Sequence, residues 1–308
     1  MENKVEVARR ELAKWMQANG QSQAKVAKSL GISAATVSMF LKGTYTGDNE
    51  QIAAGVTNLL ELDQKQSVAV RNPGFAVTAI ASDIITVADY AHTHRDIGVI
   101  YGDAGIGKTA AITEYAKNNP MSVLITVDVT STVKTVLEDI LDALGCKSVA
   151  SNRNQAKRQL VKELRDTNRM IIIDEAQHLK RPTLEAVRGI IYDLCHCGVL
   201  LVGNETIYTK MLGRQKAPFA QLFSRVGICR GFVQPRYQIS LEDCKRVFCQ
   251  DIDLPEECLR YLHRVANQAG GLRSAIKLFV MSWEISNNAG EPVNLDMAKA
   301  AENYLIRV

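Results

Sequence analysis

The chain has 308 residues, of which 46% are hydrophobic, and a formal net charge of +4. This length and composition allow a large buried core and predict two or three domains. No window approaches the ~20 consecutive apolar residues that a membrane span needs, and Glu2, Lys4 and Glu6 stand where a signal peptide has its apolar core. We therefore expect a cytoplasmic protein that does not engage a membrane. The odd number of cysteines, seven, argues against a disulfide framework.

The N-terminal segment is basic and is expected to form short helices. Residues 1–47 contain seven Lys or Arg against three Glu, an excess that suits a phosphate backbone, although a solvated helix face would also explain it. Ser22 and Ser33 stand at predicted helix N-caps, and Gly31 and Gly43 stand where those two helices should end. A further helix is predicted over roughly 49–62.

The two capped helices resemble the helix-turn-helix pattern of the phage-repressor type. Ala27 occupies the small position of the first helix, and Val37 and Phe40 form the buried face of the second. The small and basic residues exposed on the second helix are candidates for DNA binding: Ser33, Ala34, Ala35, Thr36, Ser38 and Lys42. Because small hydroxyl side chains mostly reach phosphates, we expect weak sequence preference. A three-helix protein-binding module would share this pattern and remains an alternative.

Residues 66–76 are predicted to be a linker, because helical periodicity is lost there and Asn72-Pro73-Gly74 is a turn signal. We predict an N-terminal domain at 1–65, an α/β core at 77–235 and a helical lid at 236–308. In the core, a helix at about 77–93 precedes four apolar runs, at 97–101, 122–129, 170–174 and 198–203, which alternate with helices at 133–144, 153–167 and 182–196. This alternation predicts a parallel sheet covered on both faces. The lid should contain helices at about 240–250, 255–268, 272–287 and 294–306.

The sequence GDAGIGKT at 102–109 has the spacing of a phosphate-binding loop between a strand and a helix. Glycines let the loop turn sharply, and the helix N-terminus favours anions. The residues expected to bind ATP here are Gly102, Asp103, Ala104, Gly105, Ile106, Gly107, Lys108, Thr109 and Ala110. Lys108 should bridge the β and γ phosphates, and Thr109 and Asp174 should hold Mg²⁺. Glu175 is the expected base for an attacking water, so the sequence predicts an ATPase.

Two later residues extend this site. Asn204 follows the apolar run 198–203 and is expected to lie beside Asp174, where its amide could orient the water, unless it only forms a turn. Arg273 begins a lid helix after Gly270-Gly271, so lid closure could bring its charge onto the nucleotide, unless it is a plain surface arginine. We interpret His178, which follows the Asp-Glu pair, as part of a helix start and assign it no catalytic role.

These motifs resemble those of the AAA+ ATPases: a Walker A loop at 102–109, a Walker B strand at 170–175, a sensor-1-like Asn204 and a sensor-2-like Arg273. The resemblance implies assembly into a ring or helical filament, with an arginine finger that reaches a neighbour's γ-phosphate. Arg225 is the candidate for that finger, unless it is only a solvated helix end, and Arg214 is the alternative.

A second basic region surrounds the predicted helix at 153–167. Lys134, Lys147, Arg153 and Lys157 could line a positively charged groove for DNA in an assembly, although an exposed basic helix face would look the same.

The order of these motifs along the whole chain closely resembles that of the target-DNA activator ATPases of transposable phages and, more distantly, that of the ATPases of transposons. The resemblance implies a largely sequence-nonspecific, ATP-dependent protein that polymerises on double-stranded DNA, selects the insertion target and stimulates a DDE-type transposase. A helicase loader or replication initiator, and a transcriptional regulator whose dimerisation ATP tunes, are the alternatives.

Overall fold

The computed structural model describes residues 4–69, 73–146, 152–212, 225–250 and 252–305. The chain divides into two compact units, Met1–Arg71 and Asn72–Val308. None of the described helices is long and apolar enough to cross a membrane.

The first unit consists of four helices: α1 (Lys4–Ala18), α2 (Gln23–Leu30), α3 (Ala34–Lys42) and α4 (Asn49–Ala69). Its core contains Leu12, Val37, Phe40 and Val56, each no more than 1% exposed. The predicted caps are present, because the Ser22 and Ser33 hydroxyls each accept a hydrogen bond from the N–H three residues later. The α2–α3 turn begins at Gly31, whose φ of 69° lies in the left-handed region that glycine adopts at little cost.

Helix α4 corrects two predictions made from the sequence, because it runs to Ala69 where we expected it to end near residue 62. The predicted linker at 66–76 is therefore helical in its first four residues, and 70–72 lie outside the described residues. The stretch after Leu60 is rich in good helix formers and contains no Gly or Pro before Pro73, so the helix meets no local signal that would end it.

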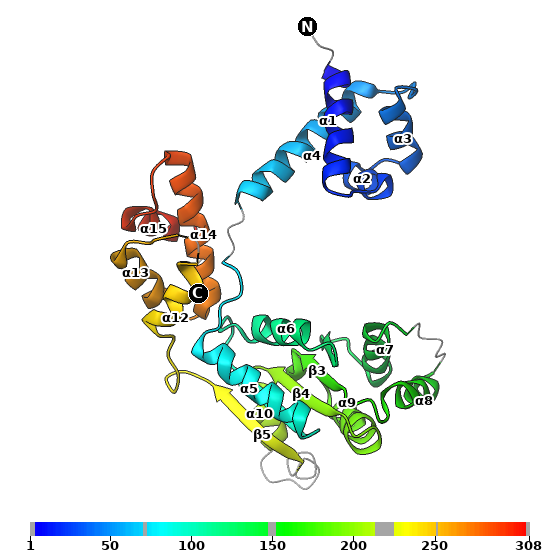
Figure 1. The fold of residues 1–308 in the computed structure, drawn as a ribbon, viewed down its shortest axis with the longest axis vertical. Coiled ribbons are helices and arrows are strands. Elements are labelled where there is room, and N and C mark those ends of the chain that lie inside the picture. Colours follow the sequence, from blue (N-terminus) through cyan, green and yellow to red (C-terminus); the bar gives the residue numbers. More distant parts are fainter. Residues whose placement is uncertain (1–3, 70–72, 147–151, 213–224, 251, 306–308) are drawn as a thin grey trace. The chain divides into compact units, whose positions relative to one another are not determined.

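The second unit is built on five parallel strands: β1 (Ile97–Gly102), β2 (Ser122–Thr126), β3 (Met170–Asp174), β4 (Gly198–Gly203) and β5 (Val226–Phe232). Their order is β2-β3-β4-β1-β5, so β4 separates the phosphate-loop strand β1 from β3. The strands β3, β4 and β5 are labelled in Figure 1. This order places Asn204, just after β4, on the strand next to Asp174, as predicted.

Successive side chains along the central strands point to opposite faces of the sheet, so the core has two layers. Ile172 and Leu200 face one layer, and their chain neighbours Ile171 and Leu201 face the other. The first layer packs against α5 (Ala79–Thr93) and α6 (Lys108–Asn118). The second packs against α7 (Val133–Ala143), α8 (Arg153–Leu164), α9 (Arg181–Val187) and α10 (Glu205–Leu212). The predicted helix at 182–196 is α9 followed by a wider π-helical segment, Arg188–Leu194.

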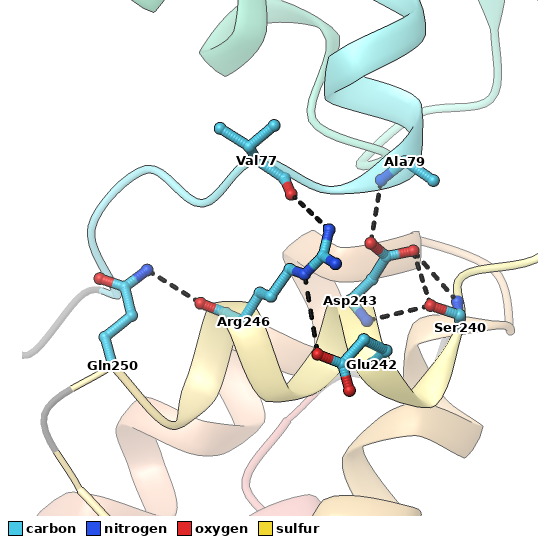
Figure 2. A network of polar contacts seen from close by, with 7 residues as sticks. All are labelled: Val77, Ala79, Ser240, Glu242, Asp243, Arg246 and Gln250. Atoms are coloured by element: carbon cyan, nitrogen blue, oxygen red, sulfur yellow. Dashed lines mark hydrogen bonds and ion pairs between the residues drawn. The ribbon is translucent and has the colours of Figure 1, made fainter.

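The C-terminal helices are α12 (Leu241–Phe248), α13 (Glu256–Ala266), α14 (Gly271–Ala289) and α15 (Leu295–Glu302). They share the first core layer with α5 and α6. Helix α12 also holds the segment that leads into α5 (Figure 2): the buried Asp243 accepts a 2.9 Å hydrogen bond from Ala79 N–H, and Arg246 donates to the Val77 carbonyl at 3.2 Å. Asp243 thereby caps α5 as well as its own helix, where it pairs with Ser240.

Candidate nucleotide-binding site

The phosphate loop lies between the end of β1 at Gly102 and the start of α6 at Lys108. Gly105 and Gly107 have φ values of 80° and 97°, so this backbone path requires glycine at both positions. Asp103 fixes the loop to the chain after β5: its N–H donates to the Phe232 carbonyl at 3.0 Å, and its carboxylate accepts from Gln234 N–H at 3.0 Å. The first turn of α6 has no side-chain cap, which leaves its N–H groups available to an anion.

Lys108 is held in the loop by two carbonyl oxygens, those of Gly102 at 2.9 Å and Asp103 at 2.7 Å. Burial lowers the pKa of Lys108 below its ordinary value of 10.5, while the charges of Asp174, Glu175 and Asp103 act in the opposite direction. A desolvated ammonium group at a helix N-terminus is suited to polyanionic phosphates.

Thr109 and Asp174 come together from α6 and β3, since the Thr109 hydroxyl donates to Asp174 Oδ2 at 2.7 Å. Asp174 is only 3% exposed, and its other oxygen accepts from Glu175 N–H at 2.9 Å. A buried carboxylate beside a hydroxyl is the oxygen donor set that Mg²⁺ prefers. The residues therefore fit Mg²⁺·ATP: Lys108 and the loop N–H groups would hold the phosphates, and Thr109 and Asp174 would hold the metal. Bound Mg²⁺ would supply positive charge to the phosphate oxygens.

Glu175 follows β3 in the left-handed conformation, at φ 56° and ψ 31°. Residues Ala176–His178 form a single 3₁₀ turn after it, so His178 belongs to a helix start, as predicted. The Gln177 amide donates a hydrogen bond to the Glu175 carboxylate, and its oxygen accepts from Asn204 N–H at 3.1 Å. Sequence reasoning missed this bridge, because nothing in the spacing of Gln177 indicates contact with the end of β4.

The side chain of Asn204 has a local role in this structure. Its Oδ1 accepts a 2.9 Å hydrogen bond from Thr206 N–H in the first turn of α10. The side-chain oxygen thus caps the next helix, which is the turn alternative considered above. The backbone of Asn204, by contrast, connects to Glu175 through Gln177.

The C-terminal helices meet the phosphate loop at Gly105. The Arg273 N–H donates to the Gly105 carbonyl at 3.1 Å, and a Cβ at Gly105 would lie 2.8 Å from the carbonyl carbon of Gly270. The side chain of Arg273 is exposed. Burial is the main cause of the lowered pKa of Lys108, and the positive charge of Arg273 lowers this pKa further. The two cations therefore lie near one another. This glycine-to-glycine approach was not foreseen from the sequence.

Arg225 lies at the amino ends of the strands, immediately before β5, whereas the phosphate loop follows the carboxyl end of β1. It lines a pocket of 410 Å³ with Arg95, Tyr192, Asp193 and His196, and its guanidinium is 3.6 Å from Asp193. Since the six residues of β1 span roughly 20 Å at about 3.3 Å each, Arg225 is remote from the phosphate loop of its own chain. Arg214, the alternative finger, lies outside the described residues.

The predicted DNA-binding residues fall into two sets, one in each unit. Ser33, Ala34, Ala35 and Lys42 are exposed on or beside α3, and Thr36 and Ser38 are partly exposed. In the second unit, Lys134 lies on α7, where it pairs with Glu138 at 3.5 Å, and Arg153 and Lys157 are exposed on α8, which packs against α7. Lys147 lies outside the described residues.

The basic residues of the first unit are not equivalent. Arg9 donates to the Phe40 carbonyl at 2.6 Å and stacks over the Phe40 ring, so it belongs to the packing of the unit. Lys25, Lys28 and Lys42 are exposed and, within the described part of the chain, make no ion pair. These three lysines carry the accessible positive charge on and around α2 and α3.

Comparison with known proteins finds a matching domain and similar chains. The AAA domain family matches residues 91–211, which include the phosphate loop, Glu175 and Asn204. The chain is 28% identical to the Mu-like prophage FluMu DNA transposition protein B of Haemophilus influenzae, covering 82% of this chain and 88% of that protein. It is also 28% identical to the ATP-dependent target DNA activator B of Escherichia phage Mu, covering 90% of this chain and 88% of that protein.

Among solved structures, the ORC2 protein of Aeropyrum pernix, described as ADPNP-ADP complexes, has a TM-score of 0.57. It is 18% identical, over 78% of this chain and 72% of that one, and this likeness concerns the fold alone. The chain therefore has the AAA+ P-loop fold, contains an AAA domain, and is homologous over most of its length to the B proteins of phage Mu and a Mu-like prophage.

Proposed function

We propose that the protein is an ATPase that binds double-stranded DNA without strong sequence preference, assembles on it with ATP, and activates a DDE-type transposase at the target. The observation that carries the proposal is the joined Thr109–Asp174–Glu175 site in a chain homologous over most of its length to transposition proteins. In this role Lys108 binds phosphate, Thr109 and Asp174 bind Mg²⁺, and Glu175 accepts the proton of the attacking water.

The first unit would supply the helix-turn-helix contact with DNA. Support comes from the exposed Ser33, Ala34 and Lys42 on and beside α3, and from the lysines at 25 and 28 on α2. Short hydroxyl and methyl side chains allow close approach to the phosphate backbone but read few base edges. Binding of this kind should fall steeply with salt and depend little on base sequence. Lys134, Arg153 and Lys157 on α7 and α8 would add a second backbone contact in the assembly.

Assembly would complete the catalytic site. Arg225 stands at the amino ends of the strands, whereas its own phosphate loop follows the carboxyl end of β1, so its guanidinium would serve the nucleotide of a neighbouring subunit. The nucleotide would then bridge two subunits, and hydrolysis would release them from DNA.

The test is electron microscopy of the wild-type protein and Glu175→Gln with ATP, Mg²⁺ and random-sequence duplex. We expect filaments or rings on DNA for both proteins, and Glu175→Gln should keep ATP binding while its assemblies persist after those of the wild type have dissociated. Discrete dimers on DNA would refute the assembly. Loss of ATP binding in Glu175→Gln would refute the role of Glu175. A salt series on random and candidate-operator duplexes separates a nonspecific binder from an operator-reading regulator.

A further inference from the structure

The Gln177 carboxamide connects two parts of the site that belong to neighbouring strands. Its nitrogen donates to the Glu175 carboxylate at the end of β3, and its oxygen accepts from Asn204 N–H, 3.1 Å away, at the end of β4. Both bonds use one planar carboxamide group, so the Glu175 carboxylate is held at a fixed position relative to the backbone at the end of β4. A leucine of similar size could fill the same space but could make neither bond.

The surroundings of Gln177 leave little freedom for another arrangement. A Cβ at Gly203, the last residue of β4, would clash with the Gln177 oxygen, so the close approach of this side chain requires glycine there. Glu175 itself has a left-handed backbone, a conformation that is unfavourable for an L-residue and persists only where the surrounding structure holds it. Gln177, in the middle of the 3₁₀ turn Ala176–His178, is partly buried.

We propose that Gln177 is a positioning residue for ATP hydrolysis, which holds the Glu175 carboxylate in place for the attacking water and fixes it to the end of β4 through Asn204 N–H. The proposal rests on the proposed function, in which Glu175 is the base. Because the Gln177 amide bonds to only one carboxylate oxygen, the other would be left to accept the proton of the water. Displacement of a catalytic group by about 1 Å can cost on the order of 100-fold in rate, whereas ATP binding depends on Lys108, Thr109 and the loop.

The experiment uses the full-length protein with ATP, Mg²⁺ and duplex DNA and compares the wild type, Gln177→Leu and Gln177→Glu. Gln177→Glu keeps the length and shape of the side chain but cannot donate to Glu175 when ionised, so it serves as a second variant if Gln177→Leu disturbs folding. We expect kcat to fall roughly ten- to hundred-fold in both variants. KM and the affinity for a non-hydrolysable ATP analogue should change less than about three-fold, because phosphate binding is left intact.

A double-mutant cycle tests whether Gln177 acts through Glu175. In single-turnover measurements, adding Gln177→Leu to Glu175→Gln should lower the residual rate less than two-fold, since there is no carboxylate left to position. The inference would be overturned if both single variants kept the wild-type kcat or had a higher one. It would also be overturned if analogue binding fell in proportion to kcat, or if the two substitutions were fully additive in the cycle. If the wild-type protein hydrolyses no ATP, the proposed function fails, and the inference fails with it.

Discussion

The contact between the phosphate loop and α14 gives a prediction whose size follows from the geometry. In Gly105→Ala the new methyl group would overlap the Gly270 carbonyl oxygen and lie 2.8 Å from its carbon, where ordinary contacts are about 3.5–4.0 Å. The obstacle is backbone, which cannot rotate away, so α14 must withdraw by more than about 1 Å. That movement lengthens the 3.1 Å hydrogen bond from Arg273 N–H to the Gly105 carbonyl beyond bonding distance.

The expected loss has two parts. A left-handed alanine costs roughly 1–2 kcal/mol at any such position, and the broken hydrogen bond adds about 1 kcal/mol. Gly290→Ala is the matched control, because Gly290 caps the other end of α14 with φ 69° and a Cβ there would meet nothing within 4 Å among the described residues. Gly105→Ala should therefore lower the free energy of unfolding by about 1 kcal/mol more than Gly290→Ala does.

The assay is urea unfolding of the nucleotide-free protein in a Trp15→Phe background. Trp283, on α14, is then the only tryptophan left, and its fluorescence reports the second unit. Equal shifts of the unfolding midpoint in Gly105→Ala and Gly290→Ala would refute the reasoning, because they would mean that α14 does not press on the loop.

Two further predictions concern stability. Asp243→Ala removes the acceptor for Ala79 N–H and the Ser240 hydroxyl and should destabilise the second unit by about 2–4 kcal/mol, measured by thermal unfolding. Asp296→Ala is the control and should show almost no loss of stability, because its side chain is 96% exposed. Similar losses of stability in the two variants would contradict the capping role of Asp243. Because the pKa of Lys108 is lowered in the folded state, the unfolded state binds more protons between that lowered pKa and 10.5, so folding is favoured as pH rises through this window. The urea midpoint of the wild type should accordingly rise relative to that of Lys108→Met between pH 7 and pH 10, and a pH-independent difference would contradict burial of the ammonium.

Local signals were sufficient for the elements and for the loop chemistry. Ser22, Ser33 and Gly31 cap helices because each acts within three or four residues of its own position, which is the range that a sequence pattern describes. The continuous apolar run at 170–173 predicts a strand covered on both faces, and Ile171 and Ile172 do face opposite layers. The predicted end of α4 was wrong because loss of periodicity does not mark where a helix stops. Pro73 is the first residue in this stretch that cannot continue a helix.

What the tertiary structure decided is how distant residues meet. The insertion of β4 between β1 and β3 brings Asn204 N–H to Gln177, and the path of α14 brings Gly270 against Gly105. These contacts join positions 27 and more than 160 residues apart in the chain. The phosphate loop could be found from sequence because its function lies in one continuous backbone segment. The setting of Glu175 could not, because it depends on strand order and on a single carboxamide that reaches between strands.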